Sequence, residues 1–176
     1  MKIIKIIGAL LIVAMAVVPA FGVGIAKADS PNYWWRDYGS SAGTTAMVLD
    51  GTNLWTGMTD GTLVEIDTTT MTDVYTDSGV GFPSAIGYMI GDGTYLYLGC
   101  ANGSMAEIEK YDIALHSIVA SWNSTEDSEF SLTGLAYDGV YLYAGVPFED
   151  PDSGDWYSHI VKIDPTTMAR IDTWTG

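Results

Sequence analysis

The sequence predicts an all-β fold made of three equivalent four-stranded antiparallel units. The first observation is an octet of one pattern that occurs three times, as DGTNLWTG at 50–57, DGTYLYLG at 92–99 and DGVYLYAG at 138–145. The second is that the segments between turn residues are short and rich in Val, Ile, Leu, Tyr, Trp and Thr, as strands are. The third is that no stretch beyond the N-terminal segment has a sustained helical period.

The N-terminal 28 residues have the features of a signal peptide. Lys2 and Lys5 form a basic start, residues 6–26 are uncharged and largely apolar, and Ala26-Lys27-Ala28 offers small residues to signal peptidase. An uncleaved membrane anchor is the alternative, because the apolar run approaches spanning length. A pilin-type cut after Gly8 is a third, less fitting option. We therefore expect a secreted or cell-surface protein, membrane-anchored if this segment is not cleaved.

In each unit the first strand precedes the octet and the second strand lies within it. The first strands are expected in TAMVL at 45–49, IGYMI at 86–90 and TGLAY at 133–137. Asp-Gly then forms a tight hairpin in which glycine takes a positive φ. We expect the leucine and the closing glycine to face a neighbouring sheet, with the glycine where another backbone approaches, and the aromatic residue to fill the opposite face. The structural repeat positions are Asp50, Gly51, Gly57, Asp92, Gly93, Gly99, Asp138, Gly139 and Gly145.

The third and fourth strands also recur in each unit. The third strand ends with a charged residue, an apolar one and an aspartate, at 65–67, 110–112 and 162–164. We expect these aspartates to accept hydrogen bonds from the following backbone, as an Asx-turn does. The fourth strands are expected in TDVYT at 72–76, SIVASW at 117–122 and ARIDTW at 169–174.

These patterns divide the chain into a signal peptide at 1–28, an N-terminal segment at 29–44 and three units at 45–82, 83–130 and 131–176, which we name repeats 1, 2 and 3. The pattern DGxxLYxG…VxKIDPTTMxxI, clearest at 138–171, resembles the blades of β-propeller proteins of the YVTN, NHL and quinoprotein-like group. The resemblance implies that each repeat is one blade, stacked face to face on its neighbour. It supplies no catalytic or cofactor residues that match this chain.

Three blades are fewer than the four to eight with which propellers usually close. One interpretation is that the chain is part of a longer protein with further blades. A second is self-association, for example of two copies in a six-bladed ring. A third is a stable three-bladed chain.

Charge and cysteine content limit the partners. Residues 29–176 keep four basic residues and all 22 acidic ones, a formal charge of −18. Such a surface repels nucleic acid and anionic lipid, so we expect neither as a partner. Cys100 is the only cysteine, so no disulfide can form within the chain, and its apolar neighbours predict a buried side chain.

The turn between the second and third strands is longest in repeat 3, where it reads PFEDPDSGDWYS at 147–158. Its acidic residues are Glu149, Asp150, Asp152 and Asp155. Oxygen ligands on a loop suit calcium, so calcium is the one cofactor that the sequence suggests, although the spacing departs from the usual calcium loop. The simpler interpretation is a solvated acidic loop. Long insertions in one repeat often carry binding sites.

The remaining candidates are weaker. Asn102 and Asn123 begin glycosylation sequons in expected loops. Glu126, Asp127 and Glu129 are expected to form a solvated connector. The two histidines, His116 and His159, lie in no serine or cysteine motif that predicts a catalytic triad.

We therefore expect an exported or cell-surface binding scaffold without enzymatic activity, which holds a protein or glycan ligand through loops or blade faces. One alternative is a segment of a lactonase-like or quinoprotein-like propeller enzyme. Another is a structural coat subunit that self-assembles.

Overall fold

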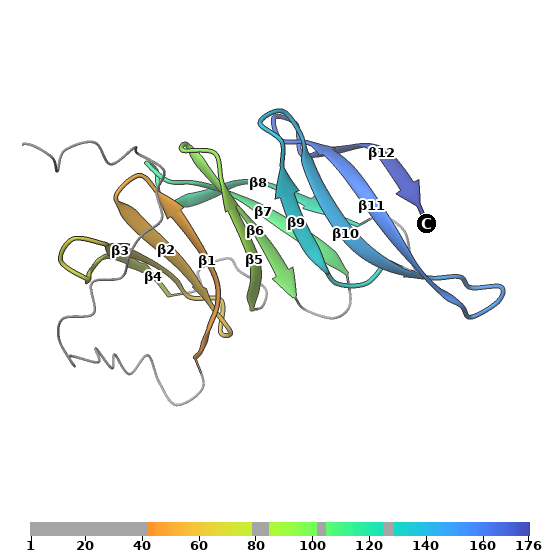
Figure 1. The fold of residues 1–176 in the computed structure, drawn as a ribbon, viewed down its shortest axis with the longest axis horizontal. Helices are drawn as coiled ribbons and strands as arrows, with labels where there is room; N and C mark the ends of the chain where they lie inside the picture. The colour runs from red at the N-terminus through yellow and green to blue at the C-terminus, as the bar shows by residue number, and fades with distance from the viewer. Residues whose placement is uncertain (1–41, 79–84, 102–104, 125–128) are drawn as a thin grey trace, which may run out of the picture. The chain divides into compact units, whose positions relative to one another are not determined.

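Among the residues that the structure describes, twelve strands form three separate four-stranded antiparallel sheets, one per repeat (Figure 1). The computed structural model describes residues 42–78, 85–101, 105–124 and 129–176. Within these ranges every regular element is a strand, as predicted. None of the described residues forms a helix that is long and apolar enough to cross a membrane. The predicted signal peptide, the sequon at Asn102 and Glu126-Asp127 lie outside the described residues.

In each sheet the strands follow chain order. Repeat 1 comprises β1 (Thr44–Asp50), β2 (Asn53–Met58), β3 (Leu63–Asp67) and β4 (Thr72–Asp77). Repeat 2 comprises β5 (Ile86–Gly91), β6 (Tyr95–Ala101), β7 (Ala106–Asp112) and β8 (Ser117–Asn123). Repeat 3 comprises β9 (Gly134–Tyr137), β10 (Leu142–Glu149), β11 (Trp156–Asp164) and β12 (Ala169–Thr175). The strands fall within the expected repeats, except that β1 begins one residue earlier.

The Asp-Gly turns adopt the expected geometry. The φ angles of Gly51, Gly93 and Gly139 are +58°, +88° and +94°, in the left-handed region that glycine tolerates best. In repeats 2 and 3 the aspartate of the Asp-Gly turn also binds a tyrosine of the same octet. The hydroxyl groups of Tyr97 and Tyr143 donate to Asp92 and Asp138 respectively, each over 2.8 Å. This tyrosine–aspartate bond holds the hairpin turn to the centre of the second strand.

The connections from the third to the fourth strand contain the predicted Asx-turns. Asp67 accepts the backbone N–H of Thr69 over 2.6 Å, and Asp164 accepts that of Thr166 over 2.7 Å. Asp112 accepts the N–H of Leu115, one residue further on, over 2.9 Å. Each connection ends in a residue other than glycine with a positive φ, namely Met71, His116 and Met168.

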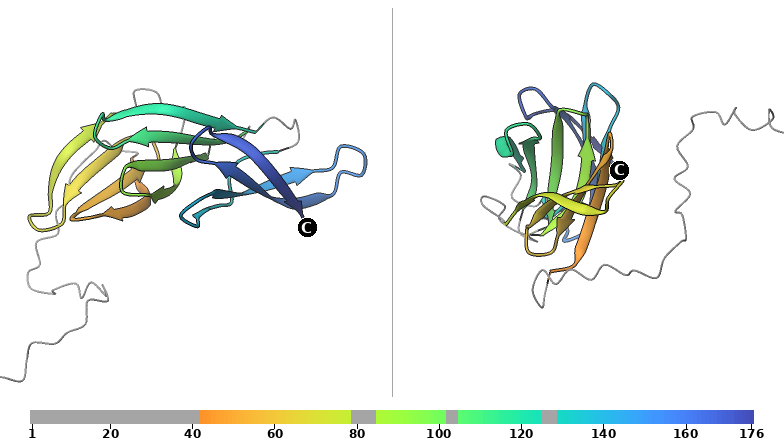
Figure 2. Two further views of the ribbon diagram at one scale, coloured as in Figure 1. Left: turned by 90° about the horizontal axis from the view of Figure 1, so that it is seen from above. Right: turned by 90° about the vertical axis from the view of Figure 1, so that its left-hand side faces the viewer.

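The sheets pack face to face through two apolar cores. The core between repeats 1 and 2 includes Trp55, Leu63, Leu96 and Leu98, all fully buried. The core between repeats 2 and 3 includes Tyr97, Ile108, Trp122, Leu142, Val161 and Met168. Repeat 2 thus contributes alternate residues of β6 to opposite cores, because successive side chains of a strand point to opposite faces. The left view in Figure 2 shows repeat 2, in green, between the other two sheets.

The closing glycine of the octet lies on the face of the aromatic residue, and not beside the leucine as predicted. A methyl group on Gly57 would lie 2.6 Å from the side chain of Ile86, and one on Gly99 would lie 2.7 Å from that of Leu132. The approaching group is thus an apolar side chain of the next repeat, where we expected backbone. Leucine and glycine stand three positions apart in a strand, which places them on opposite faces.

The turn predicted at 147–158 is shorter than expected, because both strands continue into it. Pro147 pairs with Ser158 and Glu149 pairs with Trp156, so only 150–155 forms the turn. His159 lies within β11, as its fourth residue.

Candidate functional site

The hairpin of β10 and β11 extends beyond the rest of its sheet (Figure 1). β9 pairs only with 142–145 of β10, and β12 pairs only with 159–164 of β11. The outer parts of the two strands, 146–149 and 156–158, pair with each other. Trp156 and Tyr157 lie on this extension and are 60% and 42% exposed. Together with the turn at 150–155, they make up the end of the hairpin, which we name the hairpin tip.

The turn of the hairpin tip is held by its own aspartate. The carboxylate of Asp150 accepts the backbone N–H of Asp152 over 2.8 Å and that of Ser153 over 3.4 Å. The Asp150 carbonyl accepts the N–H of Gly154 over 2.7 Å. The bond from Asp152 is the main reason that the pKa of Asp150 lies below its usual value. The Asp150 carboxylate is therefore harder to protonate than an ordinary aspartate.

The structure does not gather the four acidic residues of this loop into a cluster. Across the described ranges, no three His, Cys, Asp or Glu side chains are close enough together to hold a metal ion. Asp150 is engaged with its own turn. Calcium binding by Glu149, Asp150, Asp152 and Asp155 thus stays a prediction without geometric support.

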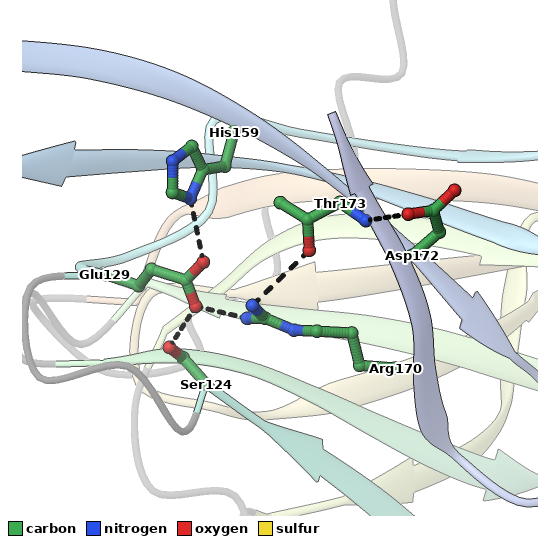
Figure 3. A network of polar contacts seen from close by, with 6 residues as sticks. All are labelled: Ser124, Glu129, His159, Arg170, Asp172 and Thr173. Carbon is green, nitrogen blue, oxygen red and sulfur yellow. Dashed lines mark hydrogen bonds and ion pairs between the residues drawn. The ribbon is translucent and has the colours of Figure 1, made fainter. Parts of the chain in front are cut away.

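Glu129 is the centre of a buried polar network between repeats 2 and 3 (Figure 3). Its side chain is fully buried, which corrects the expectation of a solvated connector. The hydroxyl of Ser124, after β8, donates to Glu129 over 2.5 Å, and Nδ1 of His159 on β11 lies 3.1 Å away. Arg170, on β12, forms an ion pair with the same carboxylate. The network therefore joins two strands of repeat 3 and its preceding segment to the end of repeat 2.

Opposing effects act on the Glu129 carboxyl. Burial, the largest single effect, raises its pKa, whereas hydrogen bonds from Arg170, Ser124 and His159 lower it. The bonds together outweigh burial, so the pKa of Glu129 lies below its usual value and the side chain is ionised at neutral pH. A buried carboxylate of this kind stays charged because Arg170 neutralises it.

The geometry of this network is that of a structural clamp. In a catalytic triad histidine bridges the nucleophile and the acid, but here Glu129 stands between Ser124 and His159. The Ser124 hydroxyl donates to a carboxylate whose pKa the hydrogen bonds and Arg170 lower, so Glu129 is a weak base toward this hydroxyl. His159 is stacked on Phe148, with ring centroids 4.6 Å apart. The arrangement fixes the positions of the two rings and joins repeat 3 to the end of repeat 2.

Sequence reasoning missed this network because its members are far apart along the chain. Glu129 and Arg170 are separated by 41 residues. One signal was available: Arg170 is one of only four basic residues beyond residue 28. A rare cation at the start of a strand is a candidate partner for a buried acid.

The other singled-out residues have local structural roles. Cys100 is fully buried, as predicted, and burial raises its pKa to about 12. His116 stacks on Tyr75 with centroids 3.8 Å apart, at the contact between repeats 1 and 2. Asn123 is exposed, but it is the last residue of β8 and lies outside a loop. Its glycosylation stays a prediction.

No protein-family model and no curated protein matches the chain. Solved structures do match it. The computationally designed protein Ika4 aligns with a TM-score of 0.58 and 17% identity, over 78% of this chain and 75% of that one. The WD40 repeats of RRP9 align with a TM-score of 0.59 and 16% identity, over 78% and 40%. The quinohemoprotein alcohol dehydrogenase from Comamonas testosteroni aligns with a TM-score of 0.57 and 17% identity, over 77% and 21%.

The chain has the β-propeller fold. Each repeat is one blade, as the sequence predicted. The propeller match spans less than half of RRP9 and about a fifth of the dehydrogenase. These neighbours include a WD40 protein and an enzyme, so the propeller fold leaves the biochemical activity open.

Proposed function

We propose that this propeller is an exported or cell-surface binding scaffold without enzymatic activity, and that it holds a protein ligand at the hairpin tip. The observation that carries the proposal is the exposure of Trp156 and Tyr157 on a hairpin that extends beyond its own sheet. Tryptophan and tyrosine contribute most to binding energy at protein interfaces. Export is supported by the signal-peptide features of residues 1–28.

The charge around these aromatic residues indicates the kind of ligand. Glu149, Asp150, Asp152 and Asp155 lie within seven residues, beside Trp156. A segment that combines Lys or Arg with apolar side chains complements such a surface. A glycan stacked on Trp156 is the second ligand class, since aromatic rings present an apolar face to sugars.

Aromatic contacts support the hairpin tip. Phe130 lies against Trp156, with ring centroids 5.5 Å apart. His159 and Phe148 stack at the base of the hairpin, where Glu129 and Arg170 clamp them. Preorganisation of this kind reduces the entropy that is lost on binding.

A library of displayed random peptides, panned against the purified chain, tests the proposal. We expect enriched peptides with basic and apolar residues. The double substitution Trp156→Ala and Tyr157→Ala should weaken their binding, measured by calorimetry, by at least about tenfold. Val140→Ala is the matched control, because Val140 is 60% exposed at the opposite end of β10.

Three results would oppose the proposal. Peptides that bind the double variant as tightly as the unchanged chain would place recognition elsewhere. Retention of defined oligosaccharides on a glycan array, with no peptide enriched, would favour the glycan. Metal bound tightly by the purified chain at a polar site, with turnover of a lactone or alcohol, would favour the enzyme class.

A further inference from the structure

The outer face of repeat 3 reproduces the face with which repeat 2 holds repeat 3. Strand pairing sets the correspondence between the two blades. Tyr97 pairs with Lys110 as Tyr143 pairs with Lys162, and Ile108 pairs with Trp122 as Ile160 pairs with Trp174. The closing glycines, Gly99 and Gly145, are the remaining corresponding pair. Five residues of each face are thus identical in type: Tyr, Gly, Ile, Lys and Trp.

These corresponding residues differ sharply in exposure. In repeat 2, Ile108 is fully buried and Trp122 is 4% exposed, because repeat 3 covers them. In repeat 3, Ile160 is 43% exposed and Trp174 is 59% exposed. Exposed large side chains that have buried counterparts in the neighbouring blade indicate a surface built to be covered.

On the exposed face of repeat 3, a lysine lies over a tyrosine ring as it does in the buried interface between repeats 2 and 3. Lys110 lies over the ring of Tyr95 at 3.9 Å, and Lys162 lies over that of Tyr141 at 3.8 Å. Lys110 also donates to the backbone carbonyl of Pro165, in the next blade, over 2.8 Å. Lys162 is therefore poised to donate to the corresponding carbonyl of an incoming blade. The residue of repeat 1 that corresponds to Pro165 is Thr68.

Repeat 1 carries the complementary face. The residues with which repeat 3 contacts repeat 2 include Leu135, Tyr137, Leu142, Val161, Ile163 and Met168. Their counterparts in repeat 1 are also apolar: Met47, Leu49, Leu54, Val64, Ile66 and Met71. Met47, Leu49 and Met71 are 62%, 63% and 54% exposed, although Val64 is buried. The outer face of repeat 3 differs from the corresponding face of repeat 2 at three positions: Gly134, Ala136 and Asp172 stand where repeat 2 has Tyr88, Ile90 and Ala120.

We propose that a second copy of this chain docks its repeat 1 on the outer face of repeat 3, in a head-to-tail contact that two copies make twice. The contact continues the interface by which repeats 2 and 3 already associate. Two copies supply six blades, which lies within the range of closed propellers, whereas three copies would supply nine. The inference concerns assembly and is independent of ligand binding at the hairpin tip.

Solution mass by light scattering, measured on the purified chain, is the first test. We expect a discrete species of twice the mass of one chain, which is 18.9 kDa for all 176 residues. Trp174→Asp and Met71→Asp each place a charge in the proposed contact. Each should raise the dimer dissociation constant by about a hundredfold or more, since a buried tryptophan typically dominates such an interface.

Controls separate this contact from other kinds of association. Val119→Asp changes a residue that is 46% exposed on repeat 2, away from both faces, and should leave the dimer intact. A mixture of the Trp174→Asp and Met71→Asp variants retains one unchanged face pair, so the mixture should dimerise more tightly than either variant alone. Far-ultraviolet circular dichroism and thermal melting verify that each variant is folded.

Several outcomes would overturn the proposal. A folded monomer at all accessible concentrations would show that the chain does not pair with itself. A monomer that becomes stable only when a further blade is fused after residue 176 would assign the face to that blade. A dimer that Trp174→Asp disrupts but Met71→Asp does not would indicate two repeat 3 faces in contact with each other.

Discussion

At the scale of single residues, Glu129 shows how burial converts a surface-type residue into a structural one. Its position after two other acidic residues suggested a solvated connector. In the folded chain the side chain is fully buried, and three polar groups satisfy it. Packing of repeat 3 on repeat 2 removes water from this site, and Arg170 keeps the carboxylate charged.

Glu129→Gln should lower the free energy of unfolding by about 3 kcal/mol, because it leaves Arg170 without its buried counter-charge. The pKa of Glu129 is lower in the folded chain than its ordinary value of 4.5. The stability that it contributes is therefore present above about pH 4.5 and is lost as pH falls through the folded value. Urea denaturation at pH 7 and pH 4 measures both effects. Asp152→Asn, on the exposed turn, is the control and should change stability little.

Glu109 is the opposite case: it is a buried carboxyl whose surroundings raise its pKa, and no hydrogen bond or opposite charge from the described residues lowers it. It is 6% exposed and faces repeat 1, at a position that is valine in the other blades, Val64 and Val161. Burial, followed by the charge of Glu107 and a hydrogen bond with it, raises the pKa of Glu109 from 4.5 to about 7. The folded chain therefore binds this proton more tightly than the unfolded chain does.

The sign of this effect predicts that Glu109 destabilises the fold increasingly as pH rises from about 4.5 to about 7. Glu109→Val should remove this dependence and raise the free energy of unfolding at pH 8 by about 2 kcal/mol. Denaturation of both chains at pH 5 and pH 8 measures the difference. A variant that is less stable than the unchanged chain at pH 8 would show that the Glu109 carboxylate has stabilising partners.

At the scale of strands, the octet combines a turn with an interlocking surface. Its Asp-Gly pair makes the hairpin, and in repeat 2 its leucine, Leu96, and its aromatic residue, Tyr97, enter opposite cores. The closing glycines of repeats 1 and 2 leave room for a side chain of the next blade. Ile86 and Leu132, the two apolar residues that fill this room, occupy corresponding positions ahead of their own octets. Repeats 1 and 2 thus each receive a side chain of the next blade.

Gly99→Ala should destabilise the chain by about 2 kcal/mol, because overpacking of a buried contact costs about this much. The added methyl group would lie 2.7 Å from the side chain of Leu132 and 3.0 Å from that of Tyr88. Gly134→Ala is the control, since a methyl group there has no neighbour within 4 Å. Thermal melting of the two variants compares them. Equal melting temperatures would show that the blades do not interlock at this glycine.

At the scale of the whole molecule, the two proposed functions lie on separate surfaces of the three blades. The hairpin tip extends from one end of repeat 3 and carries exposed aromatic residues among acidic ones. The blade faces at Trp174 and Met71 are apolar and suited to association with further blades. The strong negative charge of the chain opposes association at low salt, so the dimer measurement belongs at an ionic strength that screens it.

The sequence by itself determined the number of blades, the strand order and the turn chemistry. Those features depend on interactions within a few residues, such as the bonds that Asp138 accepts from Val140 and Tyr141. The three octets also indicate a repeat protein, and the units of such a protein bury their apolar faces by packing on one another.

Only the tertiary structure decided which side chains are buried between blades. The face of Gly99, the burial of Glu129 and the exposure of Trp174 against that of Trp122 depend on which blade covers which face. Arg170 reaches Glu129 across 41 residues, and Lys110 reaches Pro165 across 55. No local pattern encodes such contacts, because they form only when the blades stack and exclude water from the groups between them.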